Sequence, residues 1–280
     1  MSHQVVSNTL LTPAGLSPTV HRLVLVAPRV AEVRQPGQFV IIRLGPGAER
    51  IPLTIVDSDV SAGTIELVVQ AVGKSTSDLV AVAAGEFIDD VVGPLGQPTD
   101  LITKGTAVCV AGGVGAAVIY PIARRLSEIG VDVITVLGGR TSANVLFEEQ
   151  FREFGELIVC TDDGSAGRAG FVTEALADLV ATRQLDVVYA AGPVPMMRAV
   201  SAVTEASNVH TIVSLNPIMV DGTGMCGGCR VTIGGVMRFA CVDGPEFDGH
   251  AVDFAELADR LTTYRDDERA AVGHECRGTG

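Results

Sequence analysis

Thr106-Ala107-Val108-Cys109-Val110-Ala111 is followed directly by Gly112-Gly113-Val114-Gly115, and this stretch decides the fold. The first six residues are apolar or small and show no polar alternation, as expected for a strand that is buried on both faces. The glycine-rich turn joins this strand to a helix expected over Ala117–Ile129. A buried strand, a glycine turn and a helix together form the opening unit of an open parallel α/β sheet.

The same alternation of buried strand and helix continues to about residue 215. Further strands are expected at Val131–Leu137, Leu157–Cys160, Asp186–Ala190 and Thr211–Leu215, and further helices at Phe171–Ala181 and Pro195–Glu205. Strands that alternate with helices predict a doubly wound parallel sheet, here over residues 101–215. The pattern changes at Pro98–Lys104, which we take as the boundary of this domain.

Residues 1–100 follow a different pattern, in which short strands are separated by proline and glycine. Thr19–Val26, Gln38–Leu44 and Thr64–Val72 alternate in polarity and are rich in β-branched residues. Many short strands with such turns predict a small antiparallel β-barrel. One helix is expected within this domain, at Ser77–Ala84.

Residues 216–280 resemble neither of the first two regions. Residues 216–250 are rich in glycine, carry three cysteines and predict a hairpin with Gly234-Gly235 at its turn. Residues 251–280 begin with a helix expected over Asp253–Tyr264, and the polar tail from Arg265 is expected to fray. The chain therefore predicts a barrel, a doubly wound sheet and a C-terminal loop region.

The composition narrows the classes of function. The 280 residues carry a formal net charge of -13, and so acidic a chain repels nucleic-acid phosphates and anionic lipid surfaces. We therefore expect no nucleic acid and no membrane among its partners. The sequence shows neither a run of about 18 apolar residues nor a basic start followed by an apolar stretch. We expect a cytoplasmic protein whose cysteines stay reduced.

Three of the six cysteines lie within sixteen residues, and this clustering favours a metal site. Asp221 precedes Cys226 and Cys229 with the spacing D-x4-C-x2-C, and Cys241 follows at a distance. Plant-type [2Fe-2S] proteins space their first three ligands as C-x4-C-x2-C and add a distant fourth. A carboxylate at the first position has the charge needed to bind iron, although it is a harder ligand than thiolate. The sequence thus predicts a [2Fe-2S] cluster held by Asp221, Cys226, Cys229 and Cys241.

Two alternatives stay open for this loop. A Cys-x2-Cys pair is also common in structural zinc sites, although those sites usually combine two such pairs. Cys276, in the tail, could replace Asp221 as the fourth ligand. Cys109 and Cys160 fall in expected buried strands and are interpreted as packing residues.

Glycine-containing strand ends within residues 101–215 predict a dinucleotide site. The turn at residues 112–115 would let a phosphate approach the backbone at the positive end of a helix. Three further strand ends would share the carboxyl edge of the sheet, where ligands bind in such folds. The candidate residues at this edge are Gly112, Gly113, Val114, Gly115, Gly139, Arg140, Asp162, Asp163, Gly192 and Pro193. Because the strict GxGxxG pattern is missing, a tight turn without a ligand is the alternative.

Charged residues at this edge bear on the choice of nicotinamide. Asp162 and Asp163 could bond ribose hydroxyls and repel a 2′-phosphate, so NAD(H) is expected. Arg140 and Arg168 could instead bind a 2′-phosphate, which keeps NADP(H) as an alternative. All four could also be solvated loop charges.

Two motifs in residues 1–100 each follow a strand. The first is Arg50-Ile51-Pro52-Leu53-Thr54-Ile55, and the second is Gly73-Lys74-Ser75-Thr76, which opens the expected helix. Together they resemble the two flavin-binding motifs of the ferredoxin–NADP reductase superfamily. The order of the chain is similar too, with a flavin barrel, a GGVG-type nicotinamide domain and then a cluster loop.

The resemblance implies an FAD site in the barrel. It implies that the isoalloxazine ring is lined by Pro52, Leu53 and Thr54, with Thr54 near its reactive edge. It implies that the flavin or its ribityl chain is contacted by Val68, Val69 and Gln70. It also implies that the pyrophosphate is bound by Gly73, Ser75 and Thr76. The superfamily's pyrophosphate arginine aligns with Ile51, so a role for Arg50, one place earlier, is an open question. Hydride transfer between two cofactors needs no protein nucleophile, so no catalytic acid or base is expected.

Within the superfamily, the chain resembles two electron-transfer subunits over nearly its whole length. One is the small (beta) subunit of NADH-dependent reduced ferredoxin:NADP oxidoreductase, also known as sulfide dehydrogenase. The other is the electron-transfer subunit of dihydroorotate dehydrogenase. The most specific stretches are 219–229 and 239–247. Asp221 matches the first type, because the second usually has cysteine at that position.

The resemblance also implies partners. The ferredoxin:NADP type implies a heterodimer with a larger flavoprotein subunit that bears [4Fe-4S] clusters, with ferredoxin reached through that partner. The expected function is then the passage of electrons between NAD(H), FAD and the [2Fe-2S] cluster. An alternative from a different class of function is that the chain is a non-catalytic regulatory module that binds zinc and a nucleotide.

Overall fold

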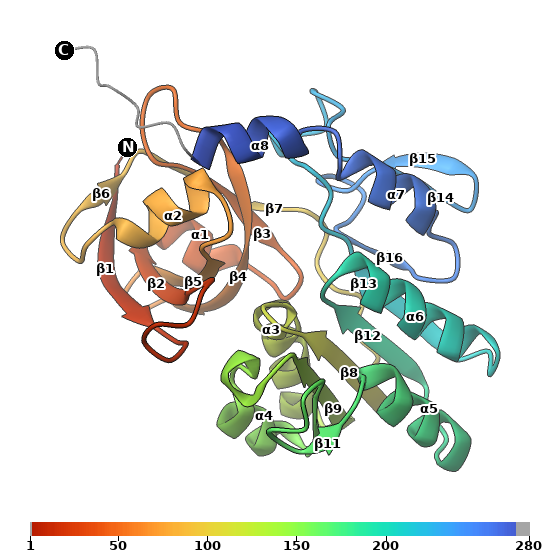
Figure 1. The fold of residues 1–280 in the computed structure, drawn as a ribbon. Helices are drawn as coiled ribbons and strands as arrows, with labels where there is room; N and C mark the ends of the chain where they lie inside the picture. The colour runs from red at the N-terminus through yellow and green to blue at the C-terminus, as the bar shows by residue number, and fades with distance from the viewer. Residues whose placement is uncertain (1, 273–280) are drawn as a thin grey trace.

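In this computed structural model, which describes residues 2–272, the N-terminal strands form a nearly closed antiparallel barrel (Figure 1). The strands lie in the order β6-β1-β2-β5-β4-β3-β7. They are β1 (His3–Leu10), β2 (Val20–Val26), β3 (Phe39–Arg43), β4 (Ile51–Asp59), β5 (Thr64–Gln70), β6 (Phe87–Ile88) and β7 (Asp90–Leu95). Helices α1 (Pro28–Val33) and α2 (Lys74–Ala81) accompany them. Alternation in β2 buries Leu23 and Leu25 completely, which is why this strand was recognisable from its sequence.

Residues from 106 onward form the expected doubly wound sheet, in the order β11-β10-β9-β8-β12-β13-β16. Its parallel strands are β8 (Thr106–Gly112), β9 (Asp132–Gly139), β10 (Glu156–Thr161), β11 (Arg168–Ala169), β12 (Val187–Ala191) and β13 (His210–Ser214), and β16 (Glu246–Asp248) pairs antiparallel with β13. The helices are α3 (Gly115–Glu128), α4 (Glu148–Phe154), α5 (Val172–Thr182) and α6 (Val194–Glu205), with a 3-10 turn at Ser142–Asn144.

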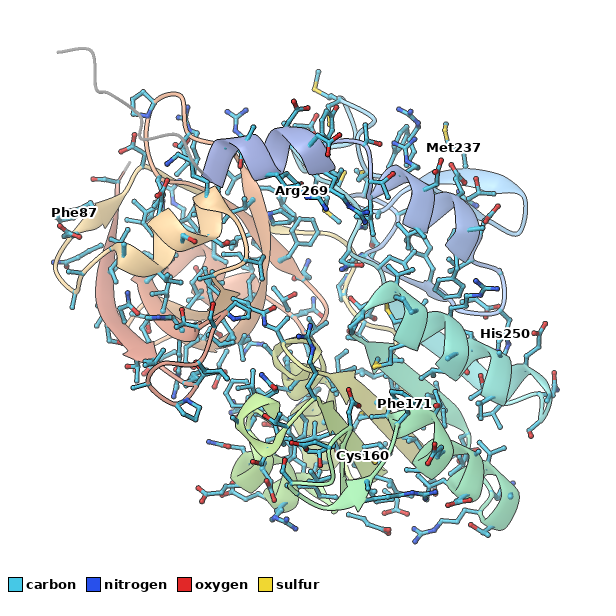
Figure 2. The ribbon with its side chains drawn as sticks, viewed as in Figure 1. Phe87, Cys160, Phe171, Met237, His250 and Arg269 are labelled. Carbon is cyan, nitrogen blue, oxygen red and sulfur yellow. The ribbon has the colours of Figure 1, made fainter. Side chains whose placement is uncertain are left out.

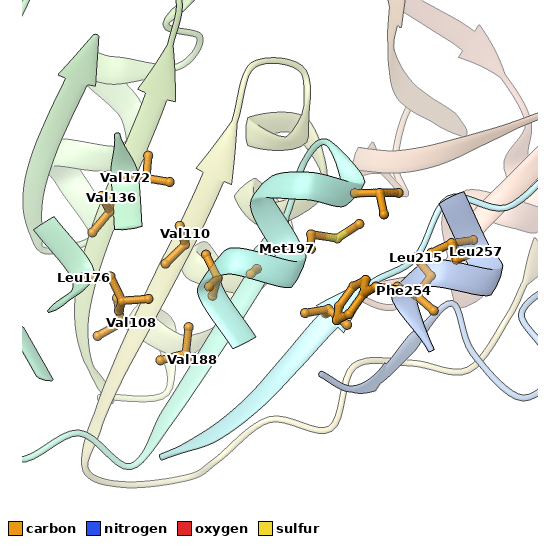
Figure 3. Close-up of a cluster of buried hydrophobic side chains, with 14 of the residues drawn as sticks. Val108, Val110, Val136, Val172, Leu176, Val188, Met197, Leu215, Phe254 and Leu257 are labelled. Atoms are coloured by element: carbon orange, nitrogen blue, oxygen red, sulfur yellow. The ribbon is translucent and has the colours of Figure 1, made fainter. Parts of the chain in front are cut away.

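Strand β8 is buried on both faces, as its unbroken apolar run predicted. Val108 and Val110 pack into the same hydrophobic core as Leu176 of α5 and Met197 of α6 (Figure 3). Cys109 lies in the core on the other face, together with residues of α3 and α4. Helices on both faces make the sheet doubly wound and leave the ends of its strands open.

The C-terminal region adds the predicted hairpin and two helices. The hairpin is β14 (Arg230–Ile233) and β15 (Val236–Phe239), joined by Gly234-Gly235 as expected. Helix α7 (Phe254–Arg260) is shorter than expected, and Asp253 is its cap, because its carboxylate accepts the N–H groups of Ala255 and Glu256. The expectation that the tail frays from Arg265 is wrong for residues 265–272, which form α8.

Helix α8 (Arg265–Val272) has a physical reason to form. Three acidic residues in its first turn complement the positive end of the helix, and Arg269 lies near its negative end. It lies across the top of the molecule, where it contacts α2 of the barrel (Figure 1). No helix within residues 2–272 is both long and apolar enough to cross a membrane.

One hydrophobic core is shared by all three regions. Phe39 and Ile41 of the barrel belong to the same core as Val110 of the sheet and Cys241 of the loop region. The connecting segment after β7 is held on both sides, because Thr99 N–H donates to Pro36 O at 2.9 Å and Gln97 N–H donates to Gly244 O at 2.7 Å. These contacts fix how the barrel and sheet face each other.

Candidate functional site

Gly113 and Gly115, in the turn between β8 and α3, have different structural roles. Gly113 adopts a φ of +56° and has open space where a Cβ would point, so the backbone is exposed to a ligand there. A Cβ on Gly115 would lie 2.2 Å from the carbonyl oxygen of Ala191, so this position can only be glycine if α3 is to pack against β12. The turn thus combines an approachable backbone at Gly113 with the start of a helix, whose positive end favours negative charge.

The structure brings the expected strand ends to one edge of the sheet. In the strand register Gly112 lies beside Gly138, and Thr161 lies beside Gly139. Asp162 N–H donates to Gly139 O at 3.1 Å. On the other side of β8, Ala191 pairs with Ala111, which places the Gly192-Pro193 turn next to the Gly112–Gly115 turn.

Sequence reasoning missed Met196 at this edge. Its side chain covers two of the glycines, because a Cβ on Gly112 would lie 2.5 Å from the sulfur and a Cβ on Gly192 would lie 2.7 Å from the methyl group. Met196 follows Gly192 at the start of α6. The signal was its position one helical turn inside the helix that follows the Gly192-Pro193 turn.

The charged residues near this edge are not equivalent. Asp163 accepts hydrogen bonds from the hydroxyl and N–H of Ser165, which hold the pKa of its carboxyl below its ordinary value. Arg168 forms ion pairs with Asp178 and Glu174 of α5. Asp162 and Arg140 are exposed. Of the two arginines considered for a 2′-phosphate, Arg168 is therefore already engaged by carboxylates.

In the barrel, β4 and β5 separate where the flavin residues were expected. The two strands are paired from Asp59–Thr64 to Ile55–Leu67. Beyond that point β4 pairs with β3 over Ile51–Thr54, and β5 pairs with β2 over Val68–Gln70. Among the described ladder pairs none joins these two segments to each other. Pro52, Leu53 and Thr54 therefore face Val68, Val69 and Gln70 across a split in the sheet.

The start of α2 presents backbone donors near this split. Gly73 precedes the helix, and the hydroxyl oxygen of Thr76 accepts the N–H groups of Gly73 at 3.0 Å and Val72 at 3.1 Å. The same hydroxyl donates to Gly73 O, so Thr76 is engaged in capping its own helix. Ser75 Oγ donates to the carboxylate of Glu49. Arg50 is exposed beside Glu49.

The cysteine loop gathers its four expected ligands into two pairs. The Cys229 and Cys241 sulfurs lie 3.2 Å apart, and both residues are buried. Asp221 is close to Cys226, because the N–H of Cys226 donates to the Asp221 carboxylate at 2.7 Å. The second carboxylate oxygen accepts Thr223 N–H at 2.8 Å, and these bonds lower the pKa of Asp221.

The donor set suits a binuclear centre better than a single metal ion. Burial and the neighbouring Cys229 raise the pKa of Cys241 to about 12, so the Cys241 thiol needs a bound cation to ionise near neutral pH. One zinc ion needs four ligands around a single point. Within residues 2–272 no three His, Cys, Asp or Glu side chains converge in that way. Two pairs of ligands match the two irons of a [2Fe-2S] cluster.

The other cysteines and histidines within residues 2–272 lie outside the cysteine loop. Cys109 and Cys160 are buried within the sheet, and Figure 2 shows Cys160 away from the cysteine loop. Cys276, the alternative fourth ligand, lies outside the described residues. His21 bonds Asn8, and His250 bonds Thr204, both through ring nitrogens.

The cysteine loop packs directly on the barrel beside the split. A Cβ on Gly222 would lie 2.6 Å from the Leu95 side chain and 2.9 Å from the Ile41 side chain. Ile41 is the ladder partner of Pro52. One strand therefore separates the loop that carries the expected cluster ligands from the residues expected to line the flavin.

A buried carboxyl that sequence reasoning missed lies where the regions meet. Glu246 of β16 accepts the Thr99 hydroxyl through one oxygen at 3.0 Å, and its other oxygen is buried without a partner among the described atoms. Gly37 of the barrel lies against the same carboxyl, because a Cβ there would be 3.0 Å from it. Burial raises the pKa of Glu246 from 4.5 to about 7.

Changing Glu246 to glutamine is expected to stabilise the protein at alkaline pH. Below pH 4.5 both the folded and unfolded states carry the proton. Between this pH and about 7 the unfolded chain ionises first, so the native carboxyl progressively costs stability, by about 3 kcal/mol in total. Urea unfolding of Glu246→Gln should therefore show the largest gain near pH 8 and a vanishing gain near pH 4.5. Asp248→Asn, on the same strand but exposed, is the matched control. A gain of equal size at every pH would refute the assignment.

Two sequence profiles match regions of the chain that contain expected site residues. The sequence profile of the iron-sulfur cluster binding domain of dihydroorotate dehydrogenase B matches residues 216–253. The profile of the oxidoreductase NAD-binding domain matches residues 109–202. These spans contain the cysteine loop and the dinucleotide turn, respectively.

Relatives match over nearly the whole chain. A Thermotoga maritima protein described as a homolog of the electron transfer subunit of dihydroorotate dehydrogenase B (NAD(+)) is 45% identical over 98% of this chain and 97% of its own length. The Bacillus caldolyticus electron transfer subunit of that enzyme is 37% identical over 85% of this chain and 95% of its own length. A solved structure of NADH-dependent reduced ferredoxin-NADP oxidoreductase, reported for its flavin-based electron bifurcation, aligns with a TM-score of 0.90 and 43% identity, over 97% of this chain and 96% of that chain. The chain therefore belongs to the family of dihydroorotate dehydrogenase B-type electron-transfer subunits, which are flavin-dependent, NAD-binding oxidoreductase subunits with an iron–sulfur region.

Proposed function

We propose that this chain passes electrons between NAD(H), an FAD in the barrel split and a [2Fe-2S] cluster, as the small subunit of a ferredoxin:NADP oxidoreductase complex. One observation carries the proposal: Gly222 of the cysteine loop packs on Ile41, the ladder partner of Pro52. Electron transfer from a flavin at Pro52 to a cluster in that loop would cross a single strand. When bound, FAD would exchange hydride with nicotinamide and single electrons with the cluster.

The residues of the chain would bind and orient these groups. Pro52–Thr54 and Val68–Gln70 would hold the flavin ring from the two separated strands, and the first N–H groups of α2, after Gly73, would bind its pyrophosphate. The open backbone at Gly113 and the start of α3 would hold the dinucleotide phosphates. Asp162, exposed at the neighbouring strand end, would bond the ribose hydroxyls of NAD(H).

Each of the two ligand pairs would bind one iron of the cluster. Asp221 and Cys226 would bind one iron, and Cys229 and Cys241 would bind the other. The Cys229–Cys241 pair is buried, and the Asp221–Cys226 pair is on the exposed side of the loop. The exposed iron would then be the one closer to a partner subunit.

Asp221→Ala is expected to lower the iron content and change the reduced-state electron paramagnetic resonance (EPR) spectrum, because one iron loses its only carboxylate ligand. Asp221→Cys should retain the cluster, since a thiolate restores four anionic ligands. Flavin absorbance serves as an internal control and should be the same in all three proteins. Unchanged iron content and an unchanged spectrum in Asp221→Ala would remove Asp221 from the ligand set.

The larger partner completes the proposed assembly. Its chemistry would be that of a flavoprotein subunit with [4Fe-4S] clusters, through which ferredoxin would exchange electrons, in the cytoplasm. Asp221 supports this choice over a dihydroorotate-oxidising partner, because a cysteine is usual in that type. The 45% identity to the homolog of the dihydroorotate dehydrogenase subunit keeps the second partner as the competing candidate.

Anaerobic rapid mixing of the purified complex tests the function directly. NADH should bleach the flavin band faster than NADPH does, and the reduced cluster signal should follow. Identification of the copurifying flavoprotein, with assays for ferredoxin-dependent NADP reduction and for dihydroorotate oxidation, separates the two partner types. A colourless protein with bound zinc would reject the electron-transfer proposal in favour of a regulatory module.

A further inference from the structure

An ion pair joins the strand of the expected flavin site to the helix of the dinucleotide site. Asp57 of β4 accepts Arg124 of α3 at 2.7 Å. Asp57 also accepts Arg34 of the barrel at 2.7 Å, and Arg34 in turn donates to Ser58 Oγ at 2.9 Å. The barrel therefore fixes the carboxylate from one side, and the helix binds it from the other.

A β-bulge aims this carboxylate at the helix. The register between β4 and β5 shifts between Ile55 and Asp57, which leaves Val56 as the extra residue. Bulges bend a strand and redirect its side chains. Val56 is buried in the same hydrophobic core as Ala116 and Ala117 of α3. The bulge thus turns both a valine and a carboxylate toward the dinucleotide helix.

The apolar contact and the ion pair constrain different motions. The hydrophobic core shared by Val56, Ala116 and Ala117 holds the helix close to the barrel. Dispersion forces have no preferred direction, so this core constrains the rotation of the helix less than a directional bond does. A charge-assisted hydrogen bond from a guanidinium to a fixed carboxylate is directional. Asp57–Arg124 therefore adds a directional constraint to the orientation of α3 on the barrel.

The ion pair lies on the same two elements as the expected cofactor sites, at a distance from each site. Asp57 is three residues along β4 from Thr54, or about 10 Å. Arg124 is nine residues along α3 from Gly115, or about 14 Å. A rotation of α3 about this point would move its N-terminal turn, and the dinucleotide held there, relative to Thr54. Displacements of about 1 Å can reduce the rate of a transfer step by about a hundredfold.

We propose that Asp57 and Arg124 are positioning residues that align the nicotinamide with the flavin for hydride transfer. This inference rests on the proposed exchange of hydride between NADH and FAD. It assigns to the pair an effect on the rate of transfer and none on the binding of either cofactor, since neither residue lies at the dinucleotide turn or in the strand split.

The chain offers a matched control at the neighbouring residue. Arg125, like Arg124, forms an ion pair with Glu128. Only Arg124 also reaches Asp57 on the barrel. Arg124→Ala and Arg125→Ala therefore remove the same charge and a similar intrahelical pair, and they differ in the contact between α3 and β4.

Rapid mixing of the holoprotein with NADH is the test. Arg124→Ala should slow flavin reduction at saturating NADH by about tenfold, while Arg125→Ala stays within twofold of the parent chain. The NADH dissociation constant, measured by calorimetry on the oxidised protein, should be unchanged in both. Reduction by dithionite needs no aligned nicotinamide and should also be unchanged. Arg124→Lys should recover part of the rate, and high salt should slow the parent chain more than Arg124→Ala.

Three outcomes overturn the inference. They are equal rates for Arg124→Ala and the parent chain, an equal loss in Arg125→Ala, and a parallel loss of dithionite reduction or NADH affinity. The proposed function fails in a different way, because NADH would then leave the flavin of the parent chain oxidised. Asp57→Asn, which keeps the shape of the side chain and removes its charge, should repeat the effect of Arg124→Ala.

Discussion

Replacing Cys241 with alanine is expected to abolish the iron–sulfur cluster and leave a yellow protein whose flavin NADH still reduces. Cys229 and Cys241 are the buried pair of the proposed ligand set, with their sulfurs 3.2 Å apart, so the loss of either would leave one iron with a single protein ligand. Iron and acid-labile sulfide should fall to near zero, and the reduced-state EPR signal should disappear. Cys229→Ala should behave in the same way.

The flavin should survive because its expected site is built from strands of the barrel, whereas the cysteine loop only packs against one side of it. Transfer of electrons to any one-electron acceptor beyond the flavin should fall strongly. Cys160→Ala is the matched control, because Cys160 is equally buried but lies in the parallel sheet. A Cys241→Ala protein that keeps its iron would show that the ligands lie elsewhere, whereas loss of iron in Cys160→Ala would show a general effect of core substitution.

The sequence predicted those parts of the fold in which local pattern and tertiary environment agree. Strand β8 is buried on both faces and therefore has an unbroken apolar run, whereas β2 is more buried on one face and therefore alternates in polarity. Both patterns are recognisable in a sequence. Short elements such as α1, α4 and β16 were missed, because few residues carry too little periodicity. Helix α2 begins three residues before the expected Ser77, because the Thr76 hydroxyl caps it from inside the first turn.

The residues of the candidate site also differ in whether a local sequence pattern predicts them. The spacing of the glycines, of the cysteines and of Asp221 made these residues predictable, because turns and metal sites require particular residues at particular separations. Asp57 and Glu246 contact partners that are distant in sequence, and no local pattern reveals such partners. Asp57 depends on a bulge that brings it to Arg124, 67 residues away, and Glu246 depends on Thr99, 147 residues away. The assignment of individual cofactor contacts stays a prediction.

Gly115→Ala is expected to lower both the stability of the protein and its affinity for NADH. The new methyl group would lie 2.2 Å from the Ala191 carbonyl oxygen and 2.9 Å from Gly192 Cα, and backbone atoms cannot turn aside as a flexible side chain can. Helix α3 must therefore shift away from β12, at a cost of about 3 kcal/mol in the free energy of unfolding. The shift also moves the helix terminus that would hold the dinucleotide phosphates, so NADH affinity should fall by at least about tenfold.

Gly113→Ala separates the two effects. Position 113 has open space for a methyl group but a φ of +56°, so alanine there should cost about 1 kcal/mol of stability. Its methyl group would nevertheless stand where the phosphate approaches, so NADH affinity should fall far more than stability does. Gly45→Ala, in the loop after β3, meets only an ordinary contact at 3.8 Å and should change neither quantity. If Gly115→Ala unfolds at the same urea concentration as Gly45→Ala, the close contact between α3 and β12 is not as the structure describes. If Gly113→Ala binds NADH normally, the phosphates approach the protein somewhere other than this turn.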